Sequence, residues 1–418
     1  MRIASAFITS GPWQVPRPCG LSRAVSLTFS LLVIPLLLAG CATDGRLPAV
    51  PLAVANDVKP LGVPNARFYA DGDAAGAQAV ASELVENRKR YEGASFGKGK
   101  FATNHFLAIS GGGDDGAFGA GLLLSWTARG DRPSFRIVTG ISTGALSAPF
   151  AFLGPDYDDK LKAVYTETTA DDIFTKRTVI AAVADDALTD STPLRDMIAG
   201  YVDQTMLTRI AEEHDKGRLL LIATTNLDQA RSVIWNIGAI AKSKDPRARD
   251  LIIEVLRASA SIPGVFPPVM LDVTVEGKHY EEMHVDGGAI AQAFLYPPSI
   301  QAKKADLKTG TRQKRIAYVI RNGRLFRPEE SVKKQTLAIV GQTISTMTAA
   351  SGVNDTYRIY LTTKRDGVDF NLAYIGDDFA TPYTGPFDKA YMRKLFAYGY
   401  DKGRAGYPWF KTPPGYAE

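Results

Sequence analysis

The sequence is poor in cysteine and histidine, and this scarcity excludes several kinds of chemistry. Its 418 residues include 2 Cys, both near the N-terminus, and 4 His. The body of the chain therefore offers no thiol for catalysis, for a disulfide or for a cysteine-based metal site. The histidines show no metal-ligand spacing such as H-E-x-x-H. They are His105, His214, His279 and His284. We expect no metal site and no cofactor.

The chain also lacks a strong excess of charge of either sign. Its formal net charge is +5, and the charged residues are interspersed rather than clustered. Proteins that bind nucleic acid neutralise phosphates with concentrated positive charge, so no nucleic-acid partner is expected. A hydrophobic fraction of 45% is that of an ordinary globular protein.

The one long apolar run lies near the N-terminus. Residues 1–40 carry three arginines and no acidic residue, and the run Val25–Leu38 is short for a membrane span but fits the core of a signal peptide. It ends in Leu38-Ala39-Gly40-Cys41, which resembles a bacterial lipobox. The resemblance implies a signal peptide over 1–40, a lipid on Cys41 that anchors the chain to a membrane, and, because Ala42 follows, the outer membrane. A non-cleaved anchor is the alternative.

Ser142 stands in a pattern that suits a nucleophile. It lies in Gly140-Ile141-Ser142-Thr143-Gly144, after the mostly apolar run Phe135–Thr139 and before a helix of small residues that starts at Ala145. This is a strand that leads into a G-x-S-x-G turn, where a serine projects and bulky neighbours are excluded. The helix N-terminus behind the serine favours the negative charge of a tetrahedral intermediate.

A glycine-rich loop lies just upstream. The buried strand Phe106–Ser110 leads into the glycine-rich run Gly111–Gly121 and then into an apolar helix. Such a loop exposes successive backbone amides that can bind a phosphate or an oxyanion. The run also fits the dinucleotide pattern G-x-G-x-x-G, but Asp114 and Asp115 would face the pyrophosphate, and no Lys-Ser or Lys-Thr follows to complete a P-loop. An oxyanion loop is the better interpretation beside a serine nucleophile.

Asp286 is the candidate base. It opens Asp286-Gly287-Gly288, in which two glycines leave the carboxylate with little steric cover. Asp-Gly is also a common turn dipeptide, so this motif gains weight only in combination with the other two.

Together these motifs resemble the patatin-like phospholipase family, over roughly residues 101–298. They appear in the family's order, and the block Ala258–Pro263 is similar to the segment that precedes the base. The resemblance implies Ser142 as nucleophile, Asp286 as general base and the amides around Gly111, Gly112 and Gly113 as oxyanion hole. Asp115 stands where the family usually has Arg or Lys, which weakens the phospholipase assignment more than that of an acyl hydrolase.

Alternating apolar strands and helices predict an α/β fold with a mostly parallel sheet covered by helices on both faces. Active sites in such sheets lie at the carboxyl ends of strands, where the glycine loop and the serine turn both fall. Further strands are expected at 219–224, 231–235 and 315–320, and helices at 74–91, 247–260 and 329–350.

The predicted organisation has five parts. They are a signal peptide (1–40), a lipidated tether (41–70), an N-terminal helix (71–100), a catalytic core (101–300) and a C-terminal part of the same domain or cap (301–418). Many aromatic residues in the tail favour a packed cap over a lipid-facing surface.

The sequence thus predicts a serine acyl hydrolase that acts on lipid esters through a Ser-Asp dyad. A Ser-His-Asp esterase is one alternative, but all four histidines precede Asp286, so the order serine, acid, histidine cannot be met with Asp286 as the acid. The other alternative is a catalytically weak lipoprotein that binds a lipid or a partner.

Overall fold

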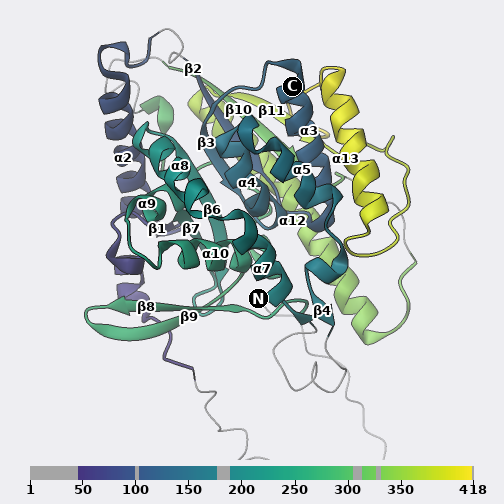
Figure 1. The fold of residues 1–418 in the computed structure, drawn as a ribbon, viewed down its shortest axis with the longest axis horizontal. Coiled ribbons are helices and arrows are strands. Elements are labelled where there is room, and N and C mark those ends of the chain that lie inside the picture. The colour runs from purple at the N-terminus through teal and green to yellow at the C-terminus, as the bar shows by residue number, and fades with distance from the viewer. Residues whose placement is uncertain (1–45, 99–102, 177–188, 305–312, 326–330, 417–418) are drawn as a thin grey trace, which may run out of the picture. The chain divides into compact units, whose positions relative to one another are not determined.

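Short apolar segments form the strands of a nine-stranded sheet in a computed structural model (Figure 1). The structure describes the chain apart from residues 1–45, 99–102, 177–188, 305–312, 326–330 and 417–418. The strands of the sheet are β1 (Arg67–Tyr69), β2 (Thr103–Ile109), β3 (Phe135–Gly140), β6 (Leu219–Asn226), β7 (Arg231–Asn236), β8 (Val269–Val275), β9 (Lys278–Asp286), β10 (Lys314–Arg321) and β11 (Asp369–Tyr374). A separate two-stranded sheet pairs β4 (Thr175–Lys176) with β5 (Thr189–Asp190).

The sheet is parallel in its centre and antiparallel at one end. Its strand order is β1-β7-β6-β3-β2-β10-β11, with the β8–β9 hairpin attached through β9 to β6. The five strands from β6 to β11 in this order run parallel. β1, β7, β8 and β9 make the antiparallel pairs. The predicted α/β fold with a mostly parallel sheet and flanking helices is confirmed.

Helices connect and cover the strands. They are α2 (Ala74–Glu92), α3 (Gly116–Arg129), α4 (Thr143–Leu153), α5 (Asp158–Thr166), α7 (Thr192–Tyr201), α8 (Gln204–Asp215), α9 (Ile237–Lys242), α10 (Ala248–Ser259), α12 (Thr336–Asp366) and α13 (Lys389–Arg404). Short 3-10 helices include η2 (Leu52–Asp57), η3 (Pro60–Gly62), η6 (Gly113–Asp115) and η9 (Gly287–Ala289).

Successive side chains of a strand point to opposite faces of the sheet, so the apolar strands build two hydrophobic cores, one on each face. Leu107 of β2 and Leu220 of β6 belong to the core that also takes up side chains of α3, α4, α8, α10 and α13. Ala108 and Leu221, their neighbours in sequence, belong to the second core, to which α2 and α12 contribute. Central strands buried on both faces read as the near-continuous apolar runs seen in the sequence.

Three segments differ from expectation. The predicted tether reaches residue 70, whereas Val50, Ala55, Val58 and Val63 are buried in the first core, so the segment from Leu47 onward does not behave as a free linker. The helix expected at 329–350 is instead α12, which begins later and continues to Asp366. The long β8–β9 hairpin was not anticipated.

The C-terminal part completes the sheet with β10 and β11 and packs its aromatic residues inward. The ring centroid of Trp409 lies 5.2 Å from that of Trp126 and 5.0 Å from that of Tyr318. Within the described residues, no helix has both the length and the hydropathy needed to cross a membrane.

Candidate active site

The G-x-S-x-G segment forms a tight turn between β3 and α4. Ser142 has φ 55° and ψ −126°, a region that L-residues rarely adopt. The turn is close to β2, since a Cβ on Gly144 would lie 2.2 Å from the carbonyl oxygen of Ile109. The Ser142 amide donates to Ser259 Oγ over 3.1 Å, and that hydroxyl donates to the Ala223 carbonyl over 2.7 Å. The backbone that holds Ser142 is thus fixed from two sides.

The register of β6 brings Asp286 to Ser142. β3 pairs with β6 as far as Gly140 opposite Ile222, and β9 takes over the same edge of β6, with Asp286 opposite Thr224. The end of β9 therefore continues where β3 stops. The Ser142 hydroxyl donates a hydrogen bond to the Asp286 carboxylate. A serine and an aspartate 144 positions apart in sequence meet at this junction.

Asp286 is buried and lacks a strong counter-charge. Its exposed fraction is 4%. Burial raises the pKa of the carboxyl group to about 7, against the opposing hydrogen bonds from the Ser142 hydroxyl and the Gly288 amide. The Gly288 amide lies 2.7 Å from Asp286 Oδ1. A carboxylate with this pKa is a much stronger base than an exposed aspartate, whose pKa is about 3.9.

The glycine loop lies against Ser142. A Cβ on Gly111 would be 3.2 Å from the Ser142 Cβ. The Gly111 amide is already engaged, because it donates to the Gln292 carbonyl over 2.9 Å. In the described part of the chain, no hydrogen bond uses the amides of Gly112 or Gly113. Gly112 has φ 155°, and a Cβ there would lie 1.9 Å from the Asn322 carbonyl oxygen, so only glycine fits.

Three supporting residues were not singled out from the sequence. Ser259 belongs to the recognised block Ala258–Pro263, whose Ser261 carbonyl also accepts the Asp286 amide over 2.9 Å. Gln292 and Asn322 carry no sequence signal. The Asn322 amide and side chain both donate to Ser110, over 2.8 and 3.0 Å, at the start of the glycine loop.

Gln292 links three parts of the site. Its side-chain amide donates to the Gly288 carbonyl over 2.9 Å, and its carbonyl receives the Gly111 amide. Its own backbone amide donates to the Asp355 carboxylate of α12 over 2.5 Å. Gln292 therefore joins the turn Asp286–Gly288, which we call the base turn, to the glycine loop and to α12.

The two acidic residues of the glycine loop point to the C-terminal region. The Tyr391 hydroxyl donates to Asp115 over 2.8 Å, and the Phe387 amide donates to Asp114 over 3.0 Å. Burial raises the pKa of Asp114, against the hydrogen bond from Phe387. Asp115 thus has a structural contact with Tyr391. The resemblance, in which Arg or Lys usually occupies this position, did not suggest this contact.

The histidines contact other groups. His284 lies between Thr224 Oγ1, 2.9 Å from Nδ1, and Glu282 Oε2, 3.2 Å from Nε2. His214 Nε2 is 3.1 Å from Glu83 Oε1, and His279 lies near Thr274 on the exposed hairpin. His105 stacks on Tyr318 at 6.0 Å. Among the described residues, no hydrogen bond joins a histidine to Ser142 or Asp286.

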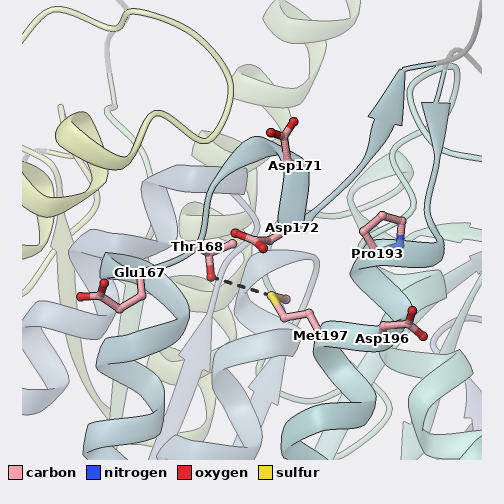
Figure 2. Close-up of a pocket in the computed structure, with 7 residues that line it drawn as sticks. All are labelled: Glu167, Thr168, Asp171, Asp172, Pro193, Asp196 and Met197. Atoms are coloured by element: carbon pink, nitrogen blue, oxygen red, sulfur yellow. Dashed lines mark hydrogen bonds between the residues drawn. The ribbon is translucent and has the colours of Figure 1, made fainter.

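A surface hollow is lined by residues other than those of the candidate site (Figure 2). It is lined by Glu167, Thr168, Asp171, Asp172, Pro193, Asp196 and Met197. Its carboxylates include Asp172, which accepts hydrogen bonds from the Thr169 amide and hydroxyl, and Glu167, which pairs with Lys389 and Arg393. Across the described residues, no group of three or more His, Cys, Asp or Glu side chains is placed to hold a metal ion.

Comparison with known proteins identifies the region that contains the site. Residues 107–296 match the family model described as patatin-like phospholipase. This segment is patatin-like. It includes the serine turn, the glycine loop and the base turn, and the family is one of hydrolases.

The other comparisons add little to the patatin-like assignment. The crystal structure of VipD from Legionella pneumophila aligns over 72% of this chain and 66% of VipD, with 13% identity and a TM-score of 0.36. The chain thus matches less than two thirds of the length of VipD. A comparison with curated proteins gives no match.

Proposed function

We propose that this protein is a serine acyl hydrolase that cleaves carboxylic esters of lipids, with Ser142 as nucleophile and Asp286 as general base. The observation that carries the proposal is the hydrogen bond from the Ser142 hydroxyl to a buried carboxylate whose pKa is about 7. The patatin-like match supports a lipid ester as the substrate.

The reaction follows from this geometry. Ser142 Oγ attacks the ester carbonyl carbon while Asp286 accepts the hydroxyl proton. The amides of Gly112 and Gly113, which have no partner among the described residues, stabilise the tetrahedral oxyanion. Asp286 then gives its proton to the leaving alcohol, and an acyl-enzyme remains. Water, activated by Asp286, releases the fatty acid by the same steps.

Gly111 has a different part in this proposal. Its amide holds the Gln292 carbonyl, so we assign it to shaping the loop rather than to donating to the oxyanion. The α4 N-terminus behind Ser142 adds a favourable dipole.

A fluorophosphonate probe tests the nucleophile. The probe should label Ser142, and Ser142→Ala should abolish both labelling and hydrolysis of a short chromogenic ester. Ser147→Ala is the matched control, because Ser147 lies one turn later on α4 and bonds to Tyr165 instead. If a folded Ser142→Ala variant hydrolysed the ester at an unchanged rate, the enzyme assignment would fail.

We also propose that the protein is a bacterial lipoprotein of the outer membrane, attached through Cys41. This site lies outside the described residues, and the support is the sequence Leu38-Ala39-Gly40-Cys41 after an apolar run. Two or more acyl chains give stable attachment, each buried CH₂ contributing about 0.8 kcal/mol. Mass spectrometry of the native protein should show a lipid-modified N-terminal Cys41, and Cys41→Ser should abolish it. An unmodified Cys41 would contradict the proposal.

A further inference from the structure

Helix α12 has two halves with different surroundings. In its second half, Thr356, Ile359, Tyr360 and Thr363 are buried. Between residues 339 and 350, by contrast, no side chain is buried. In Figure 1 the first turns of α12, in light green, extend away from the sheet.

In the exposed half of α12, the apolar side chains face solvent. Ile339, Val340, Ile344 and Met347 are 48–67% exposed. The last three follow the spacing that places residues on one face of a helix. The half-buried positions are occupied by small or polar residues, Gln342, Ser345, Thr348 and Ala349. A surface helix of a soluble protein normally has the reverse arrangement, with its apolar stripe against the core.

This exposed half ends beside residues that support the candidate site. The Arg321 guanidinium donates to the Ala349 carbonyl over 3.3 Å, and Arg321 precedes Asn322, which supports the glycine loop. Six residues later, Asp355 accepts the Gln292 amide. The stripe is therefore connected through α12 to the residues that support the glycine loop and Asp286.

The charges near the stripe favour an anionic surface. Exposed Lys333 and Lys334 directly precede the helix, and no acidic residue lies between Ser331 and Asn354. Glu329 and Glu330 come before this stretch, outside the described residues. Apolar side chains flanked by lysines suit a helix that lies in the interfacial layer of a membrane containing anionic lipids.

We propose that residues 339–350 of α12 dock into an anionic lipid surface and so place the Ser142 site against its substrate. The proposal rests on the proposed lipid hydrolase function for its purpose, but the docking itself requires no catalysis. The helix lies on the surface rather than across it, in keeping with its low overall hydropathy.

A fluorescent probe on the helix gives the direct test. A thiol-reactive nitrobenzoxadiazole dye would be attached to the full-length Met347→Cys variant, and to Leu361→Cys as the matched control on the second half of α12. Leu361 is 57% exposed on the same helix. The unsubstituted chain, labelled in the same way, gives the background from Cys19 or Cys41 wherever either remains as a free thiol.

With vesicles of phosphatidylethanolamine and phosphatidylglycerol, the dye at 347 should shift to shorter wavelength and be quenched by spin-labelled acyl chains, while the dye at 361 should not. Lys333→Gln with Lys334→Gln should weaken the shift. If the protein bound these vesicles and the dye at 347 stayed in water, the proposal would be overturned. A shift without vesicles that grew with protein concentration would also overturn it, since a second copy would then cover the stripe.

Kinetics separates docking from catalysis. Ile344→Glu with Met347→Glu should lower hydrolysis of vesicle phospholipid at least tenfold and leave hydrolysis of a soluble short-chain ester unchanged, because neither residue touches Ser142 or Asp286. Equal activity of the variant and the parent on vesicles would contradict the proposal. Ser142→Ala should keep the dye shift at 347, because docking requires no catalysis. The docking result can therefore be interpreted even if the hydrolase assignment fails.

Discussion

Strand β9 carries two buried carboxylates, Glu282 and Asp286, in contrasting surroundings. Both terminal nitrogens of Arg67, Nη1 and Nη2, donate to the Glu282 carboxylate, over 2.5 and 2.9 Å. His284 Nε2 lies 3.2 Å from Glu282 Oε2. Burial alone would raise the pKa of Glu282, but the Arg67 charge together with the hydrogen bonds from Arg67 and His284 outweighs burial and holds that pKa well below its usual range. Within the described residues, Asp286 has no ion-pair partner, only neutral donors.

The difference shows what distinguishes the proposed base, Asp286, from a carboxylate that is held charged by an ion pair, although both are buried. A buried carboxylate with a cation is permanently charged and stabilises the fold only as part of its pair. A buried carboxylate that receives only hydroxyl and amide hydrogen bonds has its pKa brought towards neutral and can exchange a proton. Five predictions test this contrast.

The largest effect is expected from Asp286→Asn on ester hydrolysis. The amide keeps the shape of the side chain but cannot accept the Ser142 proton, and general-base assistance is worth roughly 10²–10⁴-fold, so kcat should fall by about that factor. Asp272→Asn, at an exposed position of β8, is the matched control and should leave kcat unchanged. A kcat for Asp286→Asn within a few-fold of the parent would assign the base elsewhere.

Glu282→Gln should instead reduce stability. It leaves the buried Arg67 charge unpaired, and breaking a buried pair costs about 3–5 kcal/mol, measured as the free energy of unfolding in urea. Adding Arg67→Met should recover much of the loss, while Glu276→Gln in the exposed hairpin turn should have little effect. A stable Glu282→Gln single variant would show that the pair does not hold this region.

Asp286→Asn should have the opposite effect on stability at high pH. Because folding raises the pKa of Asp286 from 3.8 to about 7, the folded state binds that proton more tightly, and its stabilising contribution is lost as pH rises through this range. The variant avoids that loss and should be more stable than the parent above pH 8 by up to about 4 kcal/mol. Near pH 4 the difference should vanish. Thermal unfolding at both pH values measures it.

The parent enzyme should show the same titration in its kinetics. Only the ionised Asp286 can act as base, so kcat/KM for a soluble ester should rise about tenfold per pH unit at acidic pH and level off near pH 7. A profile already level from pH 5 upward would mean that the base has an ordinary carboxyl pKa.

The smallest effect is expected from His284→Ala. His284 is buried against Glu282 and Thr224, and burial lowers its pKa despite the opposing Glu282 charge, so it belongs to the structural pair. Activity per folded molecule should change less than about tenfold, well below the loss expected for a general base. If a folded His284→Ala variant lost activity as severely as Ser142→Ala, a histidine-based mechanism would replace the dyad.

Local chemistry explains which features could be predicted from the sequence. The serine turn, the glycine loop and the flanking strands are short-range patterns, because tight turns and strand ends leave glycines and apolar runs at fixed spacing. Helix α2 follows from its composition, rich in Ala, Glu and Lys/Arg, and α10 from the helical spacing of its apolar residues, each within one residue at both ends.

Features set by distant contacts could not be predicted. The β8–β9 hairpin brings Asp286 to Ser142 through the register of β6, which no local pattern encodes. Gln292 and Ser259 act through backbone hydrogen bonds between segments far apart in sequence. The start of α12 and the direction in which its apolar residues face were not predicted correctly, because in the first half of this helix the apolar residues do not face a core.

The positive φ of Ser142 has opposite consequences for folding and for the proposed reaction at one position. A non-glycine residue in such a conformation costs of the order of 1–3 kcal/mol, and glycine adopts it without that cost. The replacement that removes the nucleophile altogether, Ser142→Gly, is therefore also the one that the fold favours. Under the proposed function, Ser142 keeps this conformation for its chemistry, and Ser142→Gly should give a more stable but inactive protein.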